Sequence, residues 1–132
     1  NPDLKIFQGG KTLLVCAHYD IVRAENFESQ GVEVIELPGK DGKVDLRALM
    51  KELAKREIND VHVEAGARLN GALAMEGLID EYLIYVAPVF LVDGRRLLDL
   101  PSFKDLCEGV ALEFTDIQKV GPDVRLMLRP VR

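Results

Sequence analysis

The sequence predicts an α/β protein with a mostly parallel sheet, helices on both faces and a C-terminal antiparallel hairpin. Strand-like and helix-like patterns alternate three times over residues 12–76, which is typical of parallel strands joined by crossover helices. Two extended runs, 110–120 and 124–129, then flank a Gly-Pro-Asp turn, and a turn this short joins antiparallel strands.

The strands are predicted from apolar runs of strand length. Residues 12–17 form a continuous apolar run, as expected for a strand covered on both faces. Further short strands are predicted at 4–8, 32–36, 60–64 and 82–87.

The helices are predicted from apolar spacing and end signals. The clearest one follows Asp45, where apolar residues recur at helical spacing through Ala54 and the aspartate can cap the first turn. Residues 20–30 and 68–76 also follow a helical pattern, ended by Gly31 and Gly77. Residues 92–109 are predicted to be mostly loop, with a helical turn at 103–108.

Length and composition indicate one soluble domain over residues 1–132. A formal net charge of −5 argues against nucleic-acid binding through a global positive field. The apolar runs are too short to cross a bilayer, and no signal peptide opens the chain. Cys16 and Cys107 are interpreted as buried, reduced thiols of a cytoplasmic protein, with a disulfide between them as the alternative.

Several short motifs are candidate functional sites. His62 and Glu64 match half of the zinc deaminase signature, but the P-C-x-x-C half is absent, so no metal site is predicted. His18 and Tyr19 follow a strand and are weaker candidates to line a site. The G-x-G-x-x-G dinucleotide fingerprint is absent.

The most informative stretch is 61–73, which reads as strand, tight turn and helix. A helix N-terminus offers unpaired N–H groups and a positive dipole end, which together form an anion site. Gly66 leaves room for a phosphate, Arg68 adds a charge, Gly71 permits close packing, and Glu64 is placed for ligand contact. The alternative is an ordinary turn with a surface glutamate and arginine.

The order and spacing of several motifs resemble the C-terminal reductase domain of the bifunctional riboflavin-biosynthesis deaminase–reductase. They are Val-Glu-Ala-Gly at 63–66, Leu-Asn-Gly at 69–71, Gly-Leu-Ile-Asp-Glu at 77–81, Tyr-Val-Ala-Pro at 85–88 and Val-Gly-Pro-Asp-Val-Arg-Leu at 120–126. The similarity runs from about residue 60 to 129, with weaker agreement upstream.

This resemblance implies a dihydrofolate-reductase-like fold. It also implies NADPH-dependent reduction of 5-amino-6-(5-phosphoribosylamino)uracil, a pyrimidine phosphoribosylamine, to its ribitylamino form. Glu64 is then expected to contact the substrate. The cofactor-binding residues are expected to be Gly66, Ala67, Arg68, Leu69, Asn70, Gly71 and Ala72. The family often has Gly-Gly and then Pro-Thr after the glutamate, where this chain has Ala65 to Arg68. No residue is assigned to protonation of the substrate.

The resemblance also implies that this chain is the later part of the reductase domain. Zinc would belong only to a deaminase domain absent from this chain. We therefore expect the 132-residue chain to be inactive alone and to form homo-oligomers through an unpaired sheet edge. Two other classes stay open, namely a related reductase of another pterin or pyrimidine and a non-enzymatic α/β interaction module.

Overall fold

The computed structural model of the chain describes residues 5–7, 10–105 and 109–131. Its contacts divide the chain into two compact units, Asn1–Val61 and His62–Arg132. Each unit holds its own sheet, a parallel pair in the first and an antiparallel sheet in the second. The α/β class predicted from sequence is confirmed, whereas the assignment of residues 1–132 to one domain stays a prediction.

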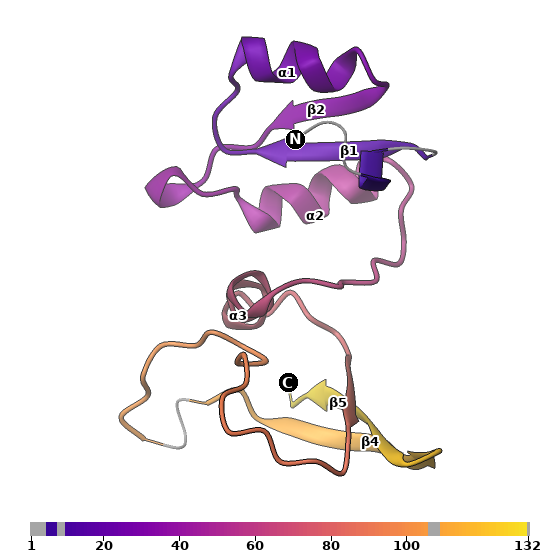
Figure 1. Cartoon of the computed structure of the whole chain (residues 1–132). Helices are drawn as coiled ribbons and strands as arrows, with labels where there is room; N and C mark the ends of the chain where they lie inside the picture. The colour runs from indigo at the N-terminus through magenta and orange to yellow at the C-terminus, as the bar shows by residue number, and fades with distance from the viewer. Residues whose placement is uncertain (1–4, 8–9, 106–108, 132) are drawn as a thin grey trace. The chain divides into compact units, whose positions relative to one another are not determined.

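The first unit is a parallel strand pair with two helices. In chain order it contains η1 (Lys5–Phe7), β1 (Thr12–Cys16), α1 (Ile21–Glu28), β2 (Val32–Glu36), η2 (Lys40–Gly42) and α2 (Leu46–Lys55). β1 and β2 pair in register from Thr12 opposite Val32 to Cys16 opposite Glu36. Figure 1 shows α1 next to β2 and α2 next to β1. Among the described residues of this unit, the buried apolar ones are Ala24 from α1, Val32 from β2 and Leu46 from α2.

Two predicted end signals of the first unit are confirmed, the Asp45 cap of α2 and the glycine at 31 that follows α1. The Asp45 carboxylate accepts a hydrogen bond of 2.8 Å from the Ala48 amide, which satisfies one of the unpaired donors of α2. Asp20 caps α1 in the same way, through a 3.1 Å bond from the amide of Arg23. Gly31 follows α1 with a φ of 79°, a conformation that glycine adopts without steric cost.

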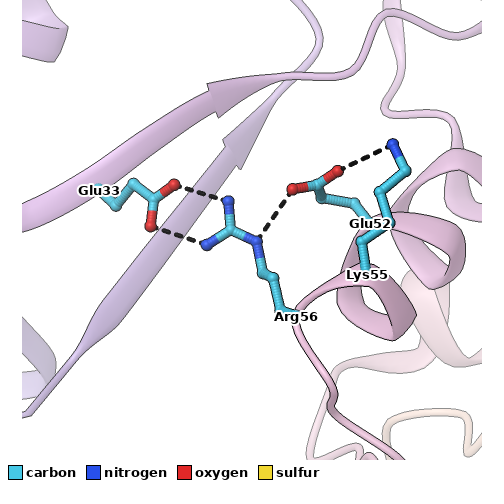
Figure 2. Close-up of polar contacts among 4 residues, drawn as sticks. All are labelled: Glu33, Glu52, Lys55 and Arg56. Carbon is cyan, nitrogen blue, oxygen red and sulfur yellow. Dashed lines mark hydrogen bonds and ion pairs between the residues drawn. The ribbon is translucent and has the colours of Figure 1, made fainter.

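An ion cluster joins the end of α2 to β2 (Figure 2). The Arg56 guanidinium donates two hydrogen bonds to the Glu33 carboxylate, of 2.7 and 2.6 Å, and a third of 3.0 Å to Glu52. Lys55 approaches the other oxygen of Glu52 at 3.4 Å. The hydrogen bonds from Arg56 lower the pKa of Glu33 and the pKa of Glu52 below the ordinary value of a glutamate. Bidentate pairing of this kind adds geometric specificity to the charge attraction.

Arg56→Gln is expected to destabilise the first unit at neutral pH, lowering its Tm by about a few degrees. Because folding lowers the pKa of Glu33 and Glu52, their contribution is present above the ordinary pKa of 4.5. It is lost as the pH falls through the lower folded-state pKa. Thermal melts of both proteins between pH 7 and pH 2 should therefore converge in acid, and a Tm difference independent of pH would contradict this account.

The second unit contains one helix and a three-stranded sheet. Its elements are α3 (Ala67–Met75), β3 (Tyr82–Val86), β4 (Leu112–Val120) and β5 (Asp123–Pro130). The strand order is β3-β5-β4, and both pairings are antiparallel. Gly121, with a φ of 60°, lies in the tight turn between β4 and β5, so the predicted C-terminal hairpin is confirmed. Leu73 and Ala74 of α3 and Leu128 of β5 are buried.

Three local predictions differ from the structure. Residues 60–64 are not a strand, and among the described residues no backbone pairs with them. Lys5–Phe7 is a short 3-10 helix, while Leu4 and Gln8 of the predicted strand lie outside the described residues. The described strands form one parallel and two antiparallel pairings rather than a mostly parallel sheet. A strand needs a neighbour for its hydrogen bonds, and residues 60–64 cross the boundary between the two units.

The predicted helical turn at 103–108 is only partly described. Residues 103–105 are not helical, and residues 106–108 lie outside the described part of the chain. No helix of the described residues is long and apolar enough to cross a membrane.

Candidate functional site

The N-terminal turn of α3 carries the candidate site. Gly66 is the N-cap residue and has no side chain to cap the helix. The first helical hydrogen bond runs from the Asn70 amide to the Gly66 carbonyl, at 3.1 Å. By helix geometry, the amides of the three residues before Asn70 have no partner within the helix. These donors and the positive end of the helix dipole together favour an anion.

The backbone at Gly66 is open to an approaching ligand. A Cβ atom built on this glycine would meet no heavy atom within 4 Å. The turn before the helix is held in place because the Asn70 side chain donates a 3.0 Å hydrogen bond to the Ala65 carbonyl. Asn70 therefore supports the site through the backbone, a role that the sequence pattern did not indicate.

Two exposed charged side chains flank this turn. Glu64 is 87% exposed, and its carboxylate lies 3.4 Å from Nε2 of His62. Arg68 is exposed on the first turn of α3. Glu64 was expected at the end of a parallel strand, but it lies in an extended segment without strand pairing. Glu64 is therefore close to the start of α3 because it precedes Gly66 by two residues, and not because a strand holds it there.

Gly71 differs from the other predicted cofactor residues because it is buried. A Cβ atom there would lie 2.9 Å from the backbone carbon and 3.0 Å from the nitrogen of Asp99, and closer still to its carbonyl oxygen. The face of Gly71 is thus occupied by another part of the chain. Leu69 and Ala72 are exposed. The second unit contains Glu64 and all seven residues predicted to bind cofactor.

His18 and Tyr19, the weaker candidates, lie in the first unit after β1. The amide of Tyr19 donates a 2.9 Å hydrogen bond to Glu36, and its hydroxyl donates one of 3.1 Å to Glu28. The bond to Glu28 raises the pKa of the Tyr19 hydroxyl above its usual value of 10.0. Tyr19, which follows β1 in the chain, is therefore bonded to the end of β2 and to α1, and the sequence pattern did not indicate either glutamate as its partner.

Metal-binding side chains do not cluster in the described residues. No group of three or more His, Cys, Asp or Glu side chains there could hold a metal ion. Cys16 is half-buried and free, with its thiol 3.4 Å from the Ile35 carbonyl. Cys107, its possible disulfide partner, lies outside the described residues.

The fold places this chain among the α/β proteins, with the uncapped start of α3 as its candidate anion site. Comparison with known families identifies the family within that class. A family model described as the RibD C-terminal domain matches residues 1–126. The chain therefore belongs to the RibD C-terminal domain family.

Two curated relatives show the level of similarity. The riboflavin biosynthesis protein RibD of Escherichia coli K12 is 43% identical over 98 residues, covering 74% of this chain and 27% of that protein. The 5-amino-6-(5-phosphoribosylamino)uracil reductase of Buchnera aphidicola from Acyrthosiphon pisum is 37% identical over 89 residues, covering 67% of this chain and 43% of that protein. The chain thus matches less than half the length of these relatives.

Solved structures agree with the fold. A RibD structure from Acinetobacter baumannii superposes with a TM-score of 0.74 at 29% identity, covering 90% of this chain and 31% of that one. The riboflavin biosynthesis reductase Rib7 of Saccharomyces cerevisiae superposes with a TM-score of 0.68 at 22% identity, covering 96% of this chain and 59% of that one. The second likeness concerns the fold alone. Together they confirm the dihydrofolate-reductase-like fold expected from the resemblance.

Proposed function

We propose that the protein containing this chain reduces 5-amino-6-(5-phosphoribosylamino)uracil with NADPH, as a step of riboflavin biosynthesis. The observation that carries the proposal is the open, uncapped N-terminus of α3, at residues for which the family resemblance implies cofactor binding. One relative is named as the reductase of this pyrimidine. The half-buried free thiol of Cys16 is compatible with a cytoplasmic protein.

The residues at the start of α3 fit the diphosphate of a dinucleotide. The amides of Ala67, Arg68 and Leu69 are donors without helical partners, and the open backbone at Gly66 allows a phosphate to come close. The Arg68 guanidinium would add one charge-assisted hydrogen bond. The hydride is supplied by NADPH when it is bound. This turn would hold and orient the cofactor through its phosphates.

Glu64 is proposed to hold the substrate. Its carboxylate is solvent-accessible and precedes the cofactor turn by two residues, so it can face a second ligand beside the first. A carboxylate accepts hydrogen bonds from the N–H groups of a pyrimidine and the hydroxyl groups of a ribosyl chain. This role is one of binding and orientation, and no proton transfer is assigned to it.

Arg68→Ala is expected to weaken NADPH binding about tenfold to 150-fold, the effect of losing one charge-assisted contact. The measurement is a fluorescence titration of NADPH with the protein in its natural full length. Because Arg68 is exposed, its removal should leave the Tm nearly unchanged. Lys51→Ala, which removes a positive charge from an exposed position of α2, is the control and should bind NADPH like the wild type.

Two outcomes of this titration would count against the proposal. Equal losses for Arg68→Ala and Lys51→Ala would indicate a general charge effect rather than a contact at α3. A wild-type protein without NADPH affinity would favour the interaction-module alternative. NADPH affinity without binding of the phosphoribosylamino pyrimidine would favour a related reductase with another substrate.

We also propose that the chain forms homo-oligomers, with β4 as the contact. β4 is an edge strand whose outer side has no ladder partner among the described residues. The bulge between Phe114 and Asp116 places Phe114 opposite Leu128 and Ile117 opposite Leu126, hence on one face. Both of these β4 side chains are 60% exposed. An exposed apolar edge strand is a template for pairing with a second copy.

Sedimentation velocity at micromolar concentration should therefore detect an oligomer. Ile117→Lys is expected to shift the distribution toward the monomer, because a charge on an edge strand opposes pairing. Lys119→Arg, which keeps the charge of a neighbouring β4 residue, is the control and should sediment like the wild type. A wild-type monomer at these concentrations would contradict the proposal.

A further inference from the structure

The predicted cofactor helix is in direct contact with a distant loop. Asp99 lies against α3 at Gly71, and residues 98–100 around it are here called the docked segment. The backbone nitrogen, carbon and oxygen of Asp99 all fall within 3.0 Å of the point where a Cβ of residue 71 would be. Real side chains do not approach backbone this closely, so only glycine allows this contact. The docked segment and α3 belong to the same unit.

A hydrogen bond joins the docked segment to the first turn of the helix. The amide of Asp99 donates to the carbonyl of Ala67, at 2.9 Å. Ala67 is the first residue of α3 and carries one of the amides proposed to bind phosphate. Leu98 and Leu100 are half-buried, whereas residues 91–97 are all exposed. The loop is therefore held to the protein at the docked segment and is open to solvent just before it.

We propose that the docked segment is a positioning element of the cofactor site and that Gly71 acts through it, without touching the cofactor. The inference rests on the proposed function, because it assumes that the first turn of α3 binds NADPH. It changes the role of Gly71, which the resemblance placed among the cofactor-binding residues, because the Asp99 backbone fills the face of this glycine. Asp99 thereby joins the site through its main chain.

A side chain at residue 71 would disturb the cofactor site in two ways, through a steric clash and through a change in hydrogen-bond direction. A methyl group at residue 71 would force either the docked segment or the first turns of α3 to move, because it would overlap the Asp99 backbone. The 2.9 Å bond between Asp99 and Ala67 would then lengthen or break. Hydrogen bonds weaken steeply as their geometry worsens, so the amides at the start of α3 would no longer point correctly toward a bound phosphate. The Arg68 guanidinium and the amides themselves would still be present.

The test compares NADPH affinity with thermal stability, using the protein in its natural full length. Gly71→Ala is expected to raise the Kd for NADPH about tenfold or more. Gly94→Ala is the matched glycine control, because a Cβ there meets nothing within 4 Å, and its Kd should equal that of the wild type. Leu73→Val trims a buried residue of the same helix and controls for a loss of stability alone.

A purely structural role would show a different pattern. In that case Gly71→Ala and Leu73→Val would lower the Tm, and neither would change the Kd of the folded protein. That result would overturn the inference while leaving wild-type NADPH binding, and with it the proposed function, intact. A wild-type protein without NADPH affinity would instead remove the proposed function and this inference together.

Hydrogen exchange on the wild-type protein tests the same coupling without a substitution. Saturation with NADPH should slow exchange of the Asp99 amide, because a bound cofactor stabilises the turn to which that amide is bonded. The exposed residues 91–94 serve as the internal control and should exchange at an unchanged rate. Unchanged exchange at Asp99 in a protein that binds NADPH would overturn the inference, even if Gly71→Ala fails to fold.

Discussion

Glu64→Gln is expected to weaken substrate binding about tenfold to 150-fold and to change NADPH affinity less. The substitution keeps the shape of the side chain and removes its charge, so only interactions that depend on the carboxylate are lost. The amides at the start of α3, which are proposed to bind the cofactor, are untouched. The side chain is 87% exposed, so the Tm should stay nearly constant.

Calorimetric titration of the substrate, next to fluorescence titration of NADPH, separates the two roles. Glu25→Gln removes a charge from an exposed position of α1 and is the matched control, expected to bind both ligands like the wild type. An equal loss of both ligands in Glu64→Gln would contradict the assignment of this residue to the substrate. If Glu64→Gln binds both ligands like the wild type, Glu64 is an ordinary surface residue, which is the alternative given above.

Leu128→Ala is expected to destabilise the second unit by about 2–5 kcal/mol. Leu128 is 7% exposed and belongs to β5, the central strand, where it pairs with Tyr82 on one side and Phe114 on the other. Removing its side chain takes apolar contacts from all three strands and leaves a cavity. Domains are stable by only about 5–15 kcal/mol, so this loss is a large part of the total.

Denaturant unfolding, followed by circular dichroism, measures this effect. Leu83→Ala is the matched control, because it makes the same change on β3 at a side chain that is 49% exposed. It should cost clearly less, since an exposed leucine gains less from burial. Equal destabilisation by the two substitutions would contradict the assignment of Leu128 to the core of the second unit.

The elements that sequence analysis located correctly have determinants close together in the chain. Asp45 caps α2 through the amide of a residue three positions later, and Gly31 and Gly121 adopt left-handed φ angles in turns. Such signals involve neighbouring residues and are visible in a linear pattern. The strand predicted at 60–64 failed because its apolar alternation says nothing about whether another backbone is available to pair with it.

The features of the candidate site also fall into those set by neighbouring residues and those set by distant contacts. The free amides of α3 follow from the start of a helix at a glycine, and Gly66 and Arg68 are part of that local pattern. The motif order from 63 to 126 identified the family, which the match over residues 1–126 confirms. The roles of Glu64 and of the α3 residues stay predictions.

The sequence by itself determined the α/β class, the Asp45 cap of α2, the hairpin and the family, because each depends on short patterns or on their order along the chain. Only the tertiary structure decided what fills the face of Gly71, what the Arg56 guanidinium binds, and which strands pair. These depend on contacts between segments far apart in sequence. Many segments have the same local sequence pattern. Only tertiary packing determines which of them comes within hydrogen-bond distance of a given partner.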